Sequence, residues 1–295
     1  MNPSFKRTRL APTPSGYLHP GNVLSFSITA HLARKSGAKI FLRIDDLDRE
    51  RLDKKYVQDI FDTLEFLGIP WDEGPRNMKE YEEEFSQVHR LPLYERALQG
   101  LKDSGNLFAC TCSRTQVAQL SEDGSYPGTC RSKKLPFDIR DASWRLDTSA
   151  SPGIGLIEWD KPASSRIPSA LENFIVRKKD GLPAYQLTSV IDDIYFGVDL
   201  VVRGEDLRAS SYAQVYLSSL LTENDFRKNT FFHHALLKNE KGEKLSKSGR
   251  DISIQNLRKQ GKDPGEIFSL IARSLGKTNE IKNWSELATS FLRNE

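Results

Sequence analysis

The chain has 295 residues, enough for one large domain or two smaller ones with a buried core, which excludes a disulfide-stapled miniprotein. Its 43 Lys and Arg residues against 40 Asp and Glu residues give a formal charge of +3, too small for binding nucleic acid by bulk charge alone. No apolar run approaches the ~18 residues of a membrane span, and the start of the chain lacks the apolar core of a signal peptide. Three clustered cysteines fit a reducing compartment, so we expect a cytoplasmic protein away from membranes, with a monomer favoured and the oligomeric state open.

Strand, turn, helix and strand patterns follow one another at the start of the chain. Residues 5–11 and 39–44 have strand character, and residues 22–37 place apolar side chains at helical spacing and end at Gly37. This order predicts a βαβ unit. Two further helices are predicted, with apolar stripes that we assign to the core: residues 53–67 and 80–104.

The middle of the chain has a different texture, rich in Gly, Ser and Pro, which predicts a mainly β insertion at 107–194. Its strand-like segments are 143–148, 155–160, 173–180 and 184–193. The α/β pattern then resumes with a strand at 197–204, a helix at 211–221 and a strand at 230–237. We therefore predict an α/β fold whose parallel sheet is split by the insertion, with these domains: 1–106, 107–194, 195–240 and 241–295.

The first motif runs from Arg9 to Asn22, where a strand end and a Gly-containing turn open onto a helix. Such a junction directs backbone N–H groups and the positive end of the helix dipole at its ligand, most often a phosphate. Gly21 would let a flat ring or a phosphate approach the backbone, and His19 could donate to a phosphate oxygen in the transition state. The alternative for His19 is a turn histidine that is hydrogen-bonded to backbone.

The second motif is Lys-Leu-Ser-Lys-Ser at 244–248, within the most basic part of the chain. Residues 227–262 hold ten Lys or Arg residues against three Asp or Glu residues. Ammonium groups on flexible stems suit a pyrophosphate leaving group, because they can follow the phosphates as charge shifts between them. The alternative is a solvated basic loop.

Together the two motifs resemble the HIGH and KMSKS signatures of class I aminoacyl-tRNA synthetases, in order, separation and setting. Further blocks resemble the glutamyl and glutaminyl branch of that family, namely RLAPTPSG, RIDDLD, AYQLTSVIDD and VVRGEDL. The resemblance covers nearly the whole chain. It implies a Rossmann-like catalytic domain, interrupted by an insertion that contacts the acceptor end of tRNA, with a short helical segment at the C-terminus.

The resemblance also implies roles for individual residues. His19 and Lys247 are the implied catalytic residues, and magnesium is expected to accompany ATP although no dedicated magnesium motif is visible. The implied ATP-binding residues are His19, Gly21, Asn22, Lys244 and Lys247. The implied glutamate-binding residues are Arg9, Thr13, Asp45, Tyr185 and Arg203.

Two cations in this set suggest glutamate rather than glutamine as the substrate. The implied partner of the substrate's α-ammonium is Asp45, where the family usually has Glu, so the shorter side chain must approach more closely or act through water. The other charged residues of that block, Arg43, Asp46 and Asp48, are left out of the site, because acidic residues after a strand usually cap helices or are solvated.

The third motif is Cys110-x-Cys112 followed by Cys130. Three thiolates in a loop-rich insertion fit a structural tetrahedral zinc site that needs one more ligand, although one residue between two thiols is tighter than the common spacing. Buried reduced cysteines are the alternative. The resemblance implies that Tyr126 is the fourth ligand, as in shortened relatives of the glutamyl branch.

Only 47 residues follow the KLSKS motif, Gly249 to Glu295, which leaves no length for an anticodon-binding domain of the usual kind. The resemblance is therefore to shortened relatives that activate glutamate with ATP, without tRNA, and place it on the queuosine base of tRNA(Asp). One alternative is a paralogue that charges an ordinary tRNA 3′ end and needs tRNA for activation. Others are a non-catalytic tRNA-binding derivative and a nucleotidyltransferase that shares only the first motif.

Overall fold

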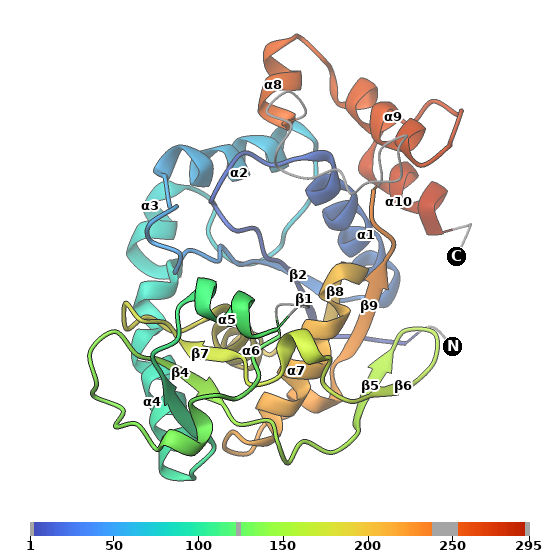
Figure 1. Ribbon diagram of the computed structural model, residues 1–295. Helices are drawn as coiled ribbons and strands as arrows, with labels where there is room; N and C mark the ends of the chain where they lie inside the picture. The colour runs from blue at the N-terminus through green and yellow to red at the C-terminus, as the bar shows by residue number, and fades with distance from the viewer. Residues whose placement is uncertain (1–2, 122–124, 238–252, 293–295) are drawn as a thin grey trace. The chain divides into compact units, whose positions relative to one another are not determined.

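The computed structural model describes residues 3–121, 125–237 and 253–292 (Figure 1). It divides into two compact units, each described by itself below. The first unit comprises Met1–His89, Leu200–Glu205 and Phe232–Glu295. The second unit comprises Arg90–Asp199 and Asp206–Phe231.

The first unit opens with the predicted βαβ arrangement. Strands β1 (Arg7–Leu10) and β2 (Lys39–Leu42) pair in parallel, and helix α1 (Pro20–Ser36) connects them (Figure 1). Gly37 ends the helix with φ +78°, a left-handed conformation that glycine adopts without steric cost. The strand, turn, helix and strand order read from the sequence is confirmed.

Helix α1 is covered by elements from distant parts of the chain. Strand β8 (Leu200–Gly204) lies against β1 and α1, and α10 (Trp284–Leu292) packs along α1. Helix α9 (Pro264–Ser274) packs on α10, and α8 (Ile254–Lys259) packs on α2 (Lys54–Phe66) (Figure 1). The predicted helical segment at the C-terminus is therefore present and closes the core of the first unit.

The helix predicted over 80–104 is broken, and this part of the prediction is wrong. The chain forms α3 (Met78–Glu80), a π-helical turn (Tyr81–Phe85), a 3₁₀ turn (Gln87–Arg90) and then α4 (Leu91–Asp103). The backbone leaves the helical conformation at Ser86, with ψ 140°. This break lets Tyr81, Ser86 and Gln87 all bond to Asp46, so a contact with a distant residue overrides the local helical pattern.

The second unit contains the mainly β insertion that the sequence predicts. Strands β3 (Leu107–Cys110), β4 (Ser143–Leu146) and β7 (Ile175–Arg177) form an antiparallel sheet. Strand β5 (Ile154–Glu158) pairs with β6 (Ala163–Ser165) in antiparallel orientation, and the first two residues of β9 (Thr230–His234) also belong to this unit. Thr230 and Phe231 pair with β5 in parallel. A short helix, α5 (Arg114–Leu120), follows the cysteine pair.

Residues 185–193, most of the segment predicted as strand-like at 184–193, are helical, which corrects the sequence prediction. They belong to α6 (Tyr185–Tyr195), which packs on α4 and on α7 (Arg208–Ser219). The β-branched residues of this run favour a strand locally. The helix instead places Asp192 in a fully buried ion pair with Arg90, 2.8 Å from its Nε, and within 2.6 Å of the Tyr94 hydroxyl.

Candidate active site and metal centre

The turn before α1 is built around the His19 side chain. His19 is the N-cap of α1: its Nδ1 accepts from Gly21 N at 3.1 Å, and Asn22 Oδ1 accepts from His19 N at 3.1 Å. This reciprocal capping box fixes the start of the helix. The structure thus supports the reading of His19 as a turn histidine bonded to backbone.

Capping leaves His19 with a defined chemistry. Because Nδ1 accepts a hydrogen bond, the neutral imidazole carries its proton on Nε2, which is then a donor. A Cβ atom at position 21 would lie 2.9 Å from His19 Cε1, so the flat ring that approaches Gly21 here is the imidazole itself. Cap and donor roles are therefore compatible in one side chain.

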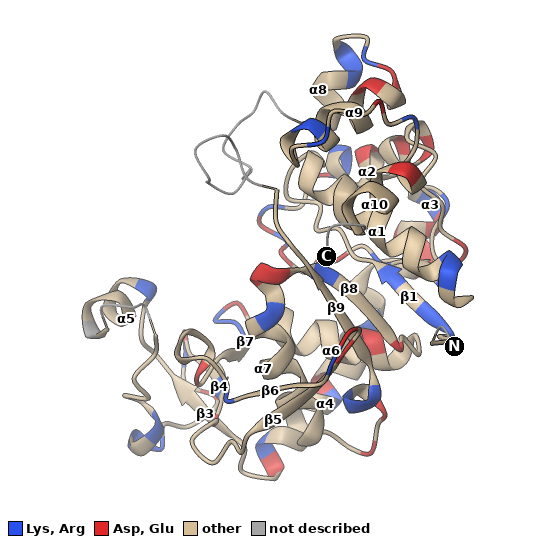
Figure 2. Cartoon of the chain, turned by 90° about the vertical axis from the view of Figure 1, so that its right-hand side faces the viewer, with Lys and Arg blue, Asp and Glu red and all other residues tan. Residues whose placement is uncertain are grey.

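Four of the five residues expected to bind glutamate belong to the first unit. Arg9 on β1 and Arg203 on β8 are both about 95% buried, and Arg9 Nη1 donates to Val202 O at 3.2 Å. Figure 2 shows basic residues on both of these strands. Asp45 N donates to Pro12 O at 2.9 Å, which brings the backbone of Asp45 alongside the loop that contains the exposed Thr13.

The fifth residue, Tyr185, is the first residue of α6 in the second unit, and its side chain is substantially exposed. The two lysines predicted to bind ATP, Lys244 and Lys247, lie outside the described residues. Their roles toward ATP stay predictions, as do the substrate roles of the residues above.

Sequence reasoning missed the residue that holds Asp45. Arg43 donates to both carboxylate oxygens, from Nε at 2.7 Å and from Nη2 at 3.1 Å, and both side chains are buried. The pair is bidentate, the geometry in which a guanidinium and a carboxylate interact most strongly. The signal in the sequence was the spacing of the two residues at the end of a strand, where alternate side chains share a face.

Asp46, which the sequence analysis left out of the site, is buried rather than solvated. Its carboxylate is buried and accepts from Tyr81 Oη at 2.7 Å, from Ser86 Oγ at 2.5 Å and from Gln87 N at 2.9 Å. Burial and the neighbouring carboxylate raise the pKa of Tyr81 far above its usual range. Asp46 therefore anchors the broken helix beside the strand that carries Asp45.

The three cysteines come together in the second unit. Their sulfur atoms all lie within 4.8 Å of one another, and the Sγ atoms of Cys112 and Cys130 are 3.6 Å apart. Tetrahedral zinc with Zn–S bonds of about 2.3 Å holds sulfurs about 3.8 Å apart, so the spacing fits the ion. Within the described residues, these three cysteines form a group whose ligand atoms lie close enough together to hold a metal ion.

Tyr126 lies at the same place. Its hydroxyl is 3.3 Å from Cys110 Sγ and accepts from Cys130 N at 2.8 Å, and the side chain is buried. Burial opposes ionisation of Cys130, but hydrogen bonds from Tyr126 and the backbone of Thr111 lower the pKa of the thiol to about 7. Burial raises the pKa of Cys112 to about 11, so Cys130 is the more readily ionised thiol of this pair for binding a metal ion.

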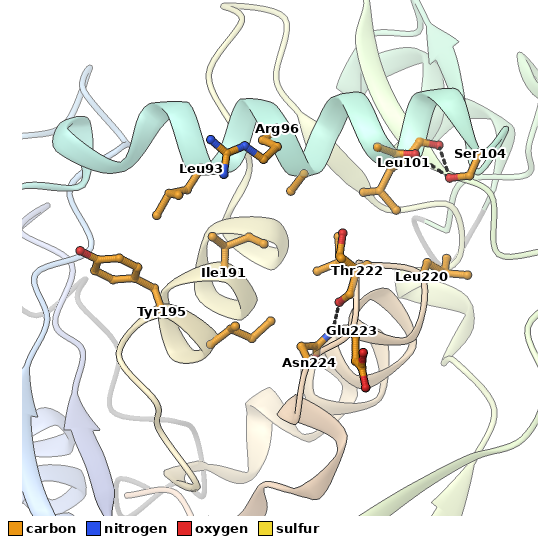
Figure 3. A pocket seen from close by; sticks show the side chains of 14 residues that line it. Leu93, Arg96, Leu101, Ser104, Ile191, Tyr195, Leu220, Thr222, Glu223 and Asn224 are labelled. Atoms are coloured by element: carbon orange, nitrogen blue, oxygen red, sulfur yellow. Dashed lines mark hydrogen bonds between the residues drawn. The ribbon is translucent and has the colours of Figure 1, made fainter.

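A separate cavity of about 540 Å³ lies within the second unit, between α4, α6 and the end of α7 (Figure 3). Its walls are mainly aliphatic, with Leu93 and Leu101 on one side and Ile191 and Leu220 on the other. None of the residues predicted to bind substrate or metal lines it.

No helix in the described parts of the chain has the length and apolar character needed to cross a membrane.

Comparisons with known proteins agree with this architecture. The chain is 31% identical to glutamate–tRNA ligase 2 of Syntrophus aciditrophicus over 99% of its length, but spans only 62% of that protein. It is 36% identical to the glutamyl-Q tRNA(Asp) synthetase of Parasynechococcus marenigrum, over 92% of this chain and 83% of the relative. In fold it resembles the glutamate–tRNA synthetase of Elizabethkingia anophelis, with TM-score 0.75 and 23% identity over 96% of this chain and 65% of that one.

The sequence pattern of one family accounts for most of the chain. Residues 6–136 and 155–294 match the catalytic domain of the class I tRNA synthetases for glutamate and glutamine. The chain therefore belongs to the class I aminoacyl-tRNA synthetase family, in the branch specific for these two amino acids.

Proposed function

We propose that the protein activates L-glutamate with ATP to form glutamyl adenylate and then transfers the glutamyl group to a tRNA. The observation that carries this proposal is the gathering, in one unit, of buried Arg9 and Arg203 with the Asp45 loop and the His19 turn. Two cations suit the side-chain carboxylate of glutamate, and the helix start suits a nucleotide phosphate. Membership of the family supports the same reaction.

In this mechanism the protein binds and orients both substrates and supplies no nucleophile. Arg9 and Arg203 hold the side-chain carboxylate, and Thr13 contributes a hydroxyl to the same pocket. The α-carboxylate of glutamate attacks the α-phosphorus of ATP, the bond to the bridging oxygen breaks, and pyrophosphate leaves. Magnesium bound with ATP would neutralise part of the phosphate charge.

The two signature motifs act on the developing charge. His19 donates from Nε2 to the transferring phosphoryl group, and Lys247 stabilises it from the other motif, while Lys244 follows the departing pyrophosphate. Gly21 and Asn22 contribute the helix start, where Asn22 keeps the turn in place through its bond to His19 N. Catalysis is then positioning and electrostatic stabilisation.

Asp45 binds the α-ammonium of glutamate in this proposal. Arg43 already occupies both carboxylate oxygens from one side, which keeps the short side chain directed in one orientation. Each carboxylate oxygen can accept a second hydrogen bond, so the ammonium group can bind directly or through a water molecule.

For the second step we propose the queuosine base of tRNA(Asp) as the acceptor, in the cytoplasm. A hydroxyl of the acceptor attacks the carbonyl of the adenylate, and AMP leaves. The name of the Parasynechococcus relative, which this chain spans to 83%, supports this choice. The similarity to the Syntrophus ligase supports the alternative of a tRNA 3′ end.

We also propose that the cysteine cluster holds a structural zinc ion, with Cys110, Cys112, Cys130 and Tyr126 as the ligands. The fit of the sulfur spacing and the position of the Tyr126 hydroxyl support this assignment. When bound, zinc would hold the end of β3 to the loop at residue 130. Its role is folding, away from the chemistry of activation.

Two measurements test the proposed function. Pyrophosphate exchange into ATP is expected with glutamate in the absence of RNA, and an absolute need for tRNA would favour an ordinary synthetase paralogue. Acylation of tRNA(Asp) is expected only when queuosine is present. Equal acylation of queuosine-free tRNA would reject the queuosine acceptor and leave the activation step standing.

A further inference from the structure

We propose that Asp59 is a positioning residue that couples the His19 turn to the chain segment that follows the KLSKS motif. This inference rests on the proposed ATP-dependent activation. Asp59 lies on α2, is 4% exposed and belongs to none of the motifs described above. A buried carboxylate needs partners, and its partners here come from two segments far apart in the sequence.

The first partner is the residue before His19. Leu18 N donates to Asp59 Oδ2 at 3.4 Å, and Leu18 is itself buried. Leu18 O accepts from Ile254 N at 2.8 Å, where α8 begins. Both backbone polar groups of Leu18 are thus bonded, one to α2 and the other to α8, immediately before the residue that caps α1.

The second partner is on α8. Arg258 Nη1 lies 3.9 Å from Asp59 Oδ1, and its guanidinium also stacks over the Phe66 ring at 5.1 Å. Burial raises the pKa of Asp59, while the Leu18 N–H and the charge of Arg258 oppose that rise. The charge of Arg258 therefore favours the ionised form of the carboxylate, and the ion pair links α8 to α2.

These contacts meet at one point of the first unit. His19 is one residue beyond Leu18, and Lys247 precedes Ile254 by seven residues in the sequence. Asp59 thus holds the residue before His19 and, through Leu18 and Arg258, the helix that follows the KLSKS motif in the sequence. The glutamate-binding residues of this unit lie on β1, β8 and the loops after β1 and β2, and none of them bonds to Asp59 among the contacts above.

The test is Asp59→Asn, which keeps the size of the side chain and an acceptor for Leu18 N. In pyrophosphate exchange, we expect kcat/KM for ATP to fall by roughly tenfold to a hundredfold, because small displacements of positioning elements cost that much. KM for glutamate should stay within about twofold of wild type. The matched control is Asp62→Asn, one turn along α2, whose carboxylate accepts from the exposed Gln58, and it should leave both parameters unchanged.

Arg258→Gln supplies a second variant at a partly exposed position, in case Asp59→Asn does not fold. The double variant should lose no more than Asp59→Asn alone, because the two residues act as a unit. Unchanged ATP kinetics in either single variant would overturn the proposal, as would equal losses toward ATP and glutamate. If wild type shows no exchange with glutamate, the proposed function fails, and calorimetry with ATP still tests the coupling: equal ATP affinity of wild type and both variants refutes it.

Discussion

The candidate substrate site and the cysteine cluster are held together by different means. Asp45 and Asp46 in the first unit are each bonded by several side chains and backbone groups of the protein. The three thiols in the second unit lie close together with few hydrogen bonds between them, although two of the three are fully buried. The carboxylates are stabilised by hydrogen bonds within the protein, whereas the thiols would be stabilised by a bound metal ion.

Metal removal should break this comparison with the largest effect. Chelation is expected to lower the unfolding free energy of the protein by roughly 5 kcal/mol or more, since structural zinc contributes roughly 10–16 kcal/mol in isolated zinc fingers. Thermal unfolding together with measurement of zinc content checks this. The Cys112→Ser variant serves as the control, and the chelator should not lower its unfolding free energy further. A metal-free protein of unchanged stability would mean buried reduced cysteines.

Asp46→Asn tests the hydrogen-bonded carboxylates of the first unit, the other region in this comparison. The amide cannot accept from all the donors that meet the carboxylate, so we expect a loss of about 3–5 kcal/mol in denaturant unfolding. Asp48→Asn is the control: Asp48 is partly exposed and paired with Arg51, so its loss should cost less than about 1 kcal/mol. Similar stabilities of the two variants would show that the buried network contributes little.

Lys247→Ala tests the nucleotide side of the proposed reaction. We expect the rate of adenylate formation to fall by roughly 10²-fold or more, with little change in glutamate affinity, because the ammonium group acts mainly on the transition state. Lys259→Ala removes an exposed charge from α8 and is the control for a general effect of charge. Unchanged turnover would remove Lys247 from the mechanism.

Arg9→Ala is expected to weaken glutamate binding by roughly 1.5–3 kcal/mol, the contribution of charged hydrogen bonds. The control is Arg7→Ala on the same strand, because Arg7 is paired with Glu73 at 2.6 Å and is more exposed. Calorimetry would decide: wild-type affinity in the Arg9 variant excludes this residue from the glutamate pocket.

Local patterns were sufficient for the parts of the fold that local physics determines. The helix predicted over 53–67, its apolar stripe and the glycine stop at Gly37 appear where the sequence indicates them. The errors arise where a distant polar partner intervenes. Ser86 leaves the helical conformation where its hydroxyl donates to Asp46. Asp192 pairs with Arg90 from within the helix that replaces the predicted strand.

The site shows the same division. The signature motifs and the cysteine spacing are local features and could be read from the sequence, including the capping turn at His19. The clamp of Arg43 on Asp45 and the contacts of Asp59 join side chains whose pairing depends on the folded chain. Local sequence patterns contain no signal for a contact between Asp59 and Leu18, which are 41 positions apart.

Glutamate activation itself is tested most directly by pyrophosphate exchange into ATP with the purified protein and one amino acid at a time. The arrangement of Arg9, Arg203 and Asp45 predicts exchange with L-glutamate and none with L-glutamine, which lacks the second carboxylate. It also predicts none with glutarate, which lacks the α-ammonium group. Exchange that is as fast with glutamine as with glutamate, or no exchange with any of them, would contradict the account.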